Sequence, residues 1–104
     1  MRAFSIDDAT TVEIDDAFSV RELPGGRTSV GIHIAAPAVS ILHGDAYDAV
    51  ARSRLSTVYM PGRKITMLPD DVVRAFSLAA GEPRPALSLY VELDEQGAPV
   101  SHRT

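Results

Sequence analysis

Four carboxylates near the start of the chain are the residues whose type and spacing best suit chemistry. Asp7, Glu13, Asp15 and Asp16 form the pattern Asp-x5-Glu-x-Asp-Asp. Carboxylates this close together repel one another, so gathering them costs free energy unless a cation holds them. Oxygen ligands without a neighbouring His or Cys favour Mg²⁺ or Mn²⁺ over Zn²⁺. The pattern therefore predicts a divalent-metal site.

Other interpretations of these acids stay open on spacing alone. The segment can be a solvated acidic loop, or its carboxylates can cap helices and turns. A calcium-binding EF-hand loop is a poor match, because it needs a glycine at its sixth position and a glutamate at its twelfth. On a strand, Glu13 and Asp15 would share a face and Asp16 would point away. A loop that enters a strand at Ala17 is what would bring all of them together with Asp7.

Charge is separated along the chain. Residues 1–22 hold six acidic and two basic residues, and the overall net charge is −4. That net charge argues against simple electrostatic binding of nucleic acid. Residues 51–64 hold four basic residues and no acid. An acidic segment (1–22) and a basic strip (51–64) on one chain suit a metal site next to a surface that binds RNA phosphates. Charges scattered over solvated faces would give the same composition. The bases of the strip are Arg52, Arg54, Arg63 and Lys64.

Two rings have both a functional and a structural interpretation. Tyr59 can stack on any nucleic-acid base, because every base offers a π-face, or it can be an ordinary aromatic residue on an extended segment. His33 suggests a general base. Its apolar neighbours and its place in the middle of a strand instead favour a structural histidine whose ring nitrogens are hydrogen-bonded.

The elements that must position these residues begin with a β-hairpin. Residues 17–23 and 27–36 each alternate apolar and polar side chains, and Pro24-Gly25-Gly26 forms the turn between them. In the second strand the branched apolar residues share one face and the small or polar residues share the other. These two sets are Val30, Ile32 and Ile34 against Ser29, Gly31, His33 and Ala35.

Two helices and further strands follow. Asp45 is the expected N-cap of a helix that fades near Ser56, with Asp48 placed to favour the helix dipole. Its small residues are expected to pack closely on a sheet; they are Ala46, Ala49, Val50 and Ser53.

A second short helix is predicted from Pro69 to Phe76. Residues 57–62 and 65–68 are expected to be extended, and residues 87–93 alternate strictly as a strand should. The last strand, residues 98–103, is expected to be barely formed.

The predicted class is α+β, with a mixed, mainly antiparallel sheet, hairpins and one or two short helices. A chain of 104 residues that is 45% hydrophobic fits one small domain or a piece of a larger one. It has no cysteine, so no disulfide or thiolate metal site is expected. No apolar run approaches the ~18 residues of a membrane span. The N-terminus lacks the apolar core of a signal peptide, so we expect a cytoplasmic protein without a membrane partner.

Short motifs occur in a fixed order over nearly the whole chain. The first is Phe4-Ser5-Ile6-Asp7 followed by Glu13-Ile14-Asp15-Asp16-Ala17. The others are Gly31-Ile32-His33-Ile34-Ala35, Arg54-x4-Tyr59-x-Pro61, Met67-Leu68-Pro69 and Phe76-Ser77-Leu78. Together they resemble the N-terminal part of the catalytic domain of the RNB family, the ribonuclease II- and ribonuclease R-like exoribonucleases. Each piece alone is weak, and their shared order carries the resemblance.

The resemblance implies the roles of particular residues. Mg²⁺, or Mn²⁺, would be held by Asp7, Glu13, Asp15 and Asp16, with Asp15 and Asp16 as the catalytic pair. Tyr59 would stack on the terminal base. The basic strip, Arg52 and Arg54 above all, would contact RNA. The chain departs from the family pattern at two positions: Glu13 stands where many relatives have Asp, and Ala36 stands where the common pattern has an acid.

The resemblance also implies 3′-to-5′ hydrolysis of single-stranded RNA to nucleoside 5′-monophosphates. Residues 1–104 would be an incomplete, N-terminal portion of the catalytic domain. The remainder of that domain and OB-type RNA-binding domains are expected in a full-length parent. The isolated chain is expected to be inactive, because relatives use a further arginine downstream. A non-catalytic RNA-binding or regulatory module and a purely structural interaction domain are the alternatives.

Overall fold

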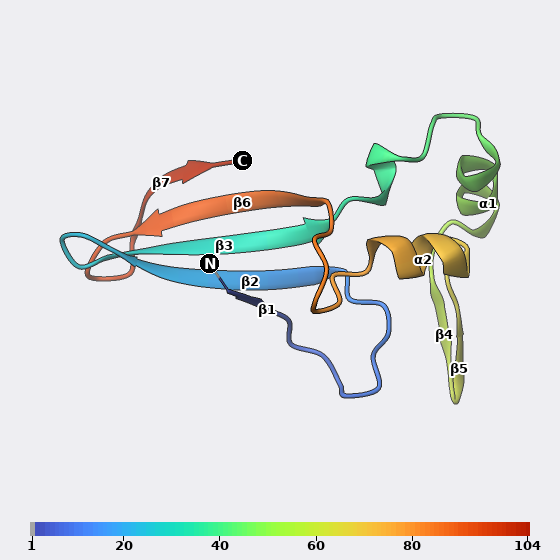
Figure 1. Cartoon of the computed structure of the whole chain (residues 1–104), viewed down its shortest axis with the longest axis horizontal. Helices are drawn as coiled ribbons and strands as arrows, with labels where there is room; N and C mark the ends of the chain where they lie inside the picture. The colour runs from blue at the N-terminus through green and yellow to red at the C-terminus, as the bar shows by residue number, and fades with distance from the viewer. Residues whose placement is uncertain (1) are drawn as a thin grey trace.

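The computed structural model describes residues 2–104, with a sheet at one end and helices with a small hairpin at the other (Figure 1). The sheet has five strands in the order β1-β2-β3-β6-β7, and every neighbouring pair is antiparallel. Its strands are β1 (Ala3–Phe4), β2 (Asp16–Leu23), β3 (Arg27–Ala35), β6 (Ala86–Leu93) and β7 (Pro99–Arg103). The other end holds η1 (Pro37–Val39), α1 (Ala46–Arg54), β4 (Val58–Met60), β5 (Arg63–Ile65) and α2 (Asp70–Phe76). The predicted α+β class with a mainly antiparallel sheet is confirmed.

The predicted hairpin is formed by β2 and β3. Phe18 lies opposite Ile32 and Val20 opposite Val30, which fixes the register. The turn needs glycine, because Gly25 and Gly26 adopt φ angles of 74° and 69°, where a side chain would clash with the backbone.

The sheet buries its polar face rather than the branched apolar one. Ser29, Gly31 and His33 of β3 are buried, whereas Ile34 is 46% exposed. A Cβ added to Gly31 would lie 2.4 Å from the Ser19 hydroxyl and 2.9 Å from Nε2 of His33. The missing side chain at Gly31 therefore leaves the space in which the histidine ring packs against the sheet.

Helix α1 forms where it was expected but packs differently. The Asp45 side chain accepts a hydrogen bond from the Asp48 amide at 2.8 Å, which confirms the N-cap. The helix ends at Arg54, two residues before the expected end, and Leu55 follows with a φ of 65°. The predicted packing on the sheet is wrong, because no residue of α1 is buried and the helix lies apart from the sheet (Figure 1). The helix is hydrogen-bonded to α2, where the Tyr47 hydroxyl donates to Asp71 at 2.9 Å, and to the segment after β5, where Arg54 donates to the Thr66 carbonyl.

The second half of the fold extends the sheet more than expected. Helix α2 starts one residue after Pro69, which is its N-cap, and it buries Val72. β7 is a paired five-residue strand, so the expectation of a barely formed strand is wrong. The Asp94 carboxylate accepts from the amides of Gln96 and Ala98 and fixes the turn that leads into it. No helix within residues 2–104 has the length and apolar character that crossing a membrane requires.

Candidate metal and RNA site

The four predicted carboxylates line one cavity of about 450 Å³. They arrive from the loop before β2 and from the start of β2, and the β4–β5 hairpin forms the opposite side. The lining residues are Asp7, Thr10, Thr11, Val12, Glu13, Asp15, Asp16, Tyr59 and Lys64. We call this space the acidic cavity. The predicted loop that enters a strand is thus what places the acids together.

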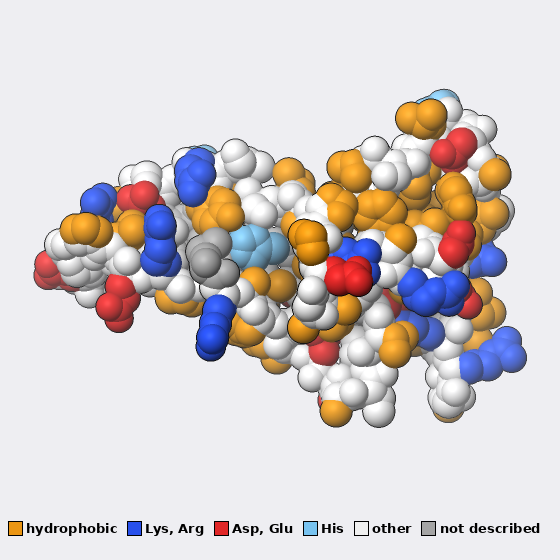
Figure 2. Space-filling model, in the orientation of Figure 1, with side chains coloured by type: hydrophobic (Ala, Val, Ile, Leu, Met, Phe, Trp, Pro, Cys, Tyr) orange, Lys and Arg blue, Asp and Glu red, His pale blue; other side chains and the backbone are white. Residues whose placement is uncertain are grey.

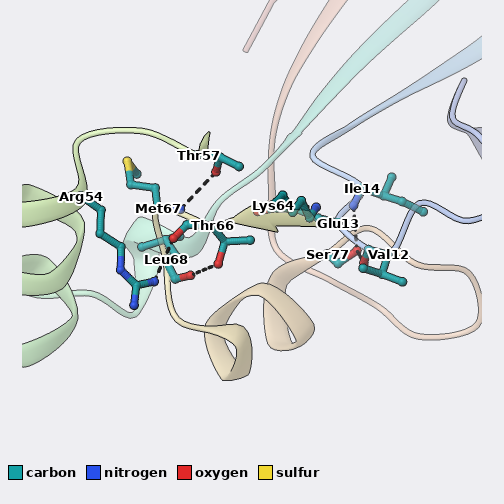
Figure 3. A network of polar contacts seen from close by, with 10 residues as sticks. All are labelled: Val12, Glu13, Ile14, Arg54, Thr57, Lys64, Thr66, Met67, Leu68 and Ser77. Atoms are coloured by element: carbon teal, nitrogen blue, oxygen red, sulfur yellow. Dashed lines mark hydrogen bonds and ion pairs between the residues drawn. The ribbon is translucent and has the colours of Figure 1, made fainter. Parts of the chain in front are cut away.

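Hydrogen bonds to its backbone hold the acidic loop, the segment before β2 that carries Glu13 and Asp15, against the rest of the fold. Ser77, which follows α2 and is 5% exposed, accepts from the Ile14 amide at 3.0 Å and donates to the Val12 carbonyl at 3.1 Å (Figure 3). The Leu78 amide donates to the Ile14 carbonyl at 2.9 Å. The Ala35 amide donates to the Asp15 carbonyl at 2.8 Å. Both flanks of Glu13 are therefore fixed by segments distant in sequence.

Lys64 reaches from the small hairpin to the acidic loop. Its ammonium donates to Oε2 of Glu13 at 2.6 Å, and the two side chains are 29% and 12% exposed (Figure 3). This hydrogen bond raises the pKa of Lys64, so the ion pair keeps the ammonium charged. Lys64 is directly opposite Tyr59 in the β4–β5 register, which puts both side chains on one face of the hairpin.

Among the four carboxylates, Asp15 has a raised pKa. Partial burial raises the pKa of its carboxyl above the ordinary value, and the Glu13 carboxylate adds to the rise. The Lys64 ammonium opposes this, while Asp16 and Asp7 contribute further repulsion. A bound cation would relieve this crowding, because it favours the ionised form of every carboxylate around it.

The donor set fits a hard divalent cation in its chemistry. All four candidate ligands are carboxylates on one cavity, and Mg²⁺ and Mn²⁺ prefer such oxygen donors. Within residues 2–104, no three Asp, Glu or His side chains are already gathered at metal-binding distance. The Glu13 carboxylate is instead bonded to Lys64.

The other predicted RNA contacts are placed unequally. Tyr59 lines the acidic cavity and is 74% exposed, so its ring is open to a ligand. Arg52 pairs with Asp48 at 2.8 Å and Arg54 donates to the Thr66 carbonyl at 2.8 Å. Neither arginine lines the cavity. Acidic and basic side chains lie side by side over this end of the molecule (Figure 2).

Sequence reasoning missed Ser77 as the residue that holds the acidic loop, and missed Thr10 and Thr11 in the cavity wall. Ser77 has no signal in spacing, because its partners lie more than sixty residues away. The sequence predicts Lys64 only as a phosphate contact. Pairing it with Tyr59 across the Pro61-Gly62 turn would have placed it at the cavity.

His33 is the structural histidine that its position predicted. Its Nε2 lies 2.8 Å from the Ser19 hydroxyl and its Nδ1 lies 2.8 Å from the Ser88 hydroxyl. Its ring meets Tyr90 edge-on at 5.7 Å, and Arg103 stacks on the Tyr90 ring at 4.4 Å. Both ring nitrogens are therefore hydrogen-bonded, as the structural interpretation predicted.

Comparison with known proteins places this geometry in a family. The model of the RNB domain matches residues 1–104. "Exoribonuclease 2" of Vibrio cholerae is 40% identical over 94 residues, which cover 89% of this chain and 14% of that protein. "Inactive exonuclease DIS3L2" of Arabidopsis thaliana is 42% identical over 94 residues, 89% of this chain and 9% of that protein. The chain thus spans a small part of the curated relatives that it matches.

A solved structure agrees with the fold. Mycoplasma genitalium RNase R, in complexes with double-stranded RNA and with ribose methylated single-stranded RNA, superposes with a TM-score of 0.89 at 24% identity. The match covers 97% of this chain and 18% or 16% of the RNase R chain in the two complexes. The five-stranded sheet with its helical end is therefore the arrangement of that domain. The chain belongs to the RNB family.

Proposed function

We propose that this chain forms part of a 3′-to-5′ exoribonuclease that hydrolyses single-stranded RNA to nucleoside 5′-monophosphates. The observation that carries the proposal is the acidic cavity, where four carboxylates face Tyr59. Such a cavity offers a divalent-metal site and a base-stacking ring within one small space. Relatives with names such as "Exoribonuclease 2" support the same reaction.

Each residue then has a task in the reaction. Asp7, Glu13, Asp15 and Asp16 would hold Mg²⁺ or Mn²⁺, with Asp15 and Asp16 nearest the reaction. A bound ion would supply Lewis acidity there and would lower the pKa of a water bound to it. Tyr59 stacks on the 3′-terminal base and accepts any base, because stacking ignores sequence. Ser77 holds the acidic loop at the end of α2 through its hydrogen bonds to Ile14 and Val12. Arg52 and Arg54 stay predicted RNA contacts that would have to leave their present partners.

The second candidate is an RNA-binding module without hydrolysis. A relative named as an inactive exonuclease is as similar as active ones at 42% identity, so similarity alone does not separate the two. The Glu13–Lys64 ion pair is the specific feature in its favour, because it engages one candidate ligand with a protein cation. A structural interaction domain is disfavoured by four carboxylates around an open cavity, which costs stability without a ligand.

The test uses the complete native protein that contains this chain. The protein is incubated with Mg²⁺ or Mn²⁺ and a 5′-labelled single-stranded oligoribonucleotide, and stepwise shortening of the labelled strand is followed. Release from the 3′ end that stops with a chelator supports the exoribonuclease. RNA binding without release supports the RNA-binding module. The absence of both binding and release would support a purely structural role. Stoichiometric Mn²⁺ binding, measured by calorimetry, separates a metal site from a solvated acidic loop.

The wider setting is also a proposal. We propose that residues 1–104 are the N-terminal portion of the catalytic domain, since the relatives are several times longer. The rest of that domain and OB-type RNA-binding domains would complete the RNA channel. We expect the isolated chain to release little mononucleotide for this reason. A cytoplasmic location stays a prediction from the sequence.

A further inference from the structure

Lys64 is the basic residue in the wall of the acidic cavity. Among the described residues that line it, four are acidic, and Lys64 alone carries a positive charge. A phosphodiester that entered would be repelled by the carboxylates, since like charges a few ångströms apart interact strongly near a protein surface. Lys64 is the one cationic side chain among the described residues of the wall. Its placement is therefore informative about where the RNA backbone would lie.

The geometry leaves Lys64 able to bind a second acceptor. An ammonium has three N–H donors, and the described contacts give Lys64 one acceptor, Oε2 of Glu13. Its side chain keeps 29% exposure. Glu13 also fixes a four-carbon stem that would otherwise lose rotamer freedom on binding. Glu13 thus positions the ammonium while donors stay available at the cavity.

Tyr59 shows which phosphate would be met. Tyr59 and Lys64 are directly opposed across β4 and β5, so their Cβ atoms are about 5 Å apart. A base stacked on Tyr59 and the phosphate of the same nucleotide are joined by a single sugar, a span of the same order. Resting on the proposed function, we propose that Lys64 contacts the last phosphodiester of the RNA whose terminal base stacks on Tyr59, with Glu13 as its positioning residue.

The test is a double-mutant cycle that measures how far the RNA affinities lost by changing Lys64 and by neutralising that phosphate depend on each other. The complete native protein binds a labelled single-stranded oligoribonucleotide in a chelator, so that RNA stays intact. A second oligoribonucleotide carries a neutral methylphosphonate at the last linkage. Affinities are measured by fluorescence anisotropy for the wild type, Lys64→Gln, Lys64→Arg and Arg27→Gln. Arg27 is the matched control, because it pairs with Glu92 in the sheet and does not line the cavity.

The expected result is coupling at Lys64 alone. Neutralising the last phosphate should weaken binding about tenfold in the wild type, the size of one charged hydrogen bond. The loss should nearly vanish in Lys64→Gln, persist in Arg27→Gln and return in Lys64→Arg. The slope of log affinity against log salt should fall by about one contact in Lys64→Gln.

Two contrary results have different meanings. If wild-type protein releases mononucleotides in Mg²⁺ but Lys64→Gln keeps the full methylphosphonate loss, Lys64 does not touch that phosphate and only this inference fails. If the wild type neither binds RNA nor releases mononucleotides, the proposed function fails and the inference fails with it.

Discussion

Two polar clusters in this molecule are built in opposite ways. Around His33, each ring nitrogen bonds to a serine hydroxyl, and Ser19 is fully buried. In the acidic cavity, one carboxylate of four has a protein cation as partner, and burial and repulsion raise the pKa of Asp15. The first cluster satisfies its hydrogen bonds internally, whereas the second keeps carboxylates without a protein cation as partner.

The difference separates a structural cluster from a ligand site. Buried polar groups that satisfy one another add specificity to a fold and need no further partner. Carboxylates gathered against their own repulsion lower stability until a ligand compensates them. Changes at His33 should therefore act on stability, and changes at Asp15 should act on chemistry.

The largest expected effect is on catalysis at Asp15. Asp15→Asn in the complete protein should lower mononucleotide release by at least about 100-fold. Loss of a residue that merely supports a metal ligand lowers metal affinity or activity about 10–100-fold, and loss of the ligand itself should cost more. RNA affinity should stay near that of the wild type. Release of labelled mononucleotide and anisotropy measure the two quantities. Full activity in this variant would remove Asp15 from the proposed metal site.

The next effect is on stability at His33. His33→Ala leaves the buried Ser19 hydroxyl without its partner, which should cost about 1–3 kcal/mol of unfolding free energy. Urea unfolding followed by circular dichroism measures it, with His43→Ala as the control, because His43 is exposed. Activity per folded molecule should be unchanged. A variant with wild-type stability but no activity would make His33 a functional residue.

Tyr59 should affect binding of the RNA end. Tyr59→Ala should cost about 1–3 kcal/mol of RNA affinity, the contribution of one stacked base. Tyr59→Phe keeps the ring and should bind like the wild type. The length of the last undigested RNA is a second readout, since a weaker hold on the end should release longer products. Unchanged affinity and product length would leave Tyr59 as an ordinary surface aromatic.

The smallest effect is a pH dependence of stability without metal. Because the folded-state pKa of Asp15 is raised, its protonated form favours folding and that contribution is lost as pH rises through the folded pKa. Asp15→Asn should therefore gain stability over the wild type toward neutral pH and lose the gain in acid.

Asp45 is a control of opposite sign for that experiment. Amides of Asp48 and Leu42 lower its pKa, so its contribution is present above the ordinary Asp pKa and disappears as pH falls. Thermal melts in a chelator between acid and neutral pH compare the variants. A pH-independent difference between Asp15→Asn and wild type would contradict the repulsion inferred for the cavity.

Local elements followed closely from local sequence. Asp45 at the start of α1, Pro69 before α2 and the Gly25-Gly26 turn each act within a few residues, so their effect is visible in the chain itself. The predicted packing of α1 was wrong. Small residues at helical spacing indicate that a helix can pack closely, but they do not identify the element that it packs against. β7 was underestimated because its pairing with β6 depends on the turn built by Asp94.

By itself the sequence determined the strand and helix types, the family motifs and the four carboxylates. Tertiary structure decided that Ser77 holds the acidic loop, that Lys64 meets Glu13, and that Arg52 and Arg54 have partners elsewhere. It also decided that β3 buries the His33 face. The physical reason is range: propensity, capping and periodicity act between neighbours along the chain. Ion pairs and burial depend instead on which distant segments the completed sheet brings together.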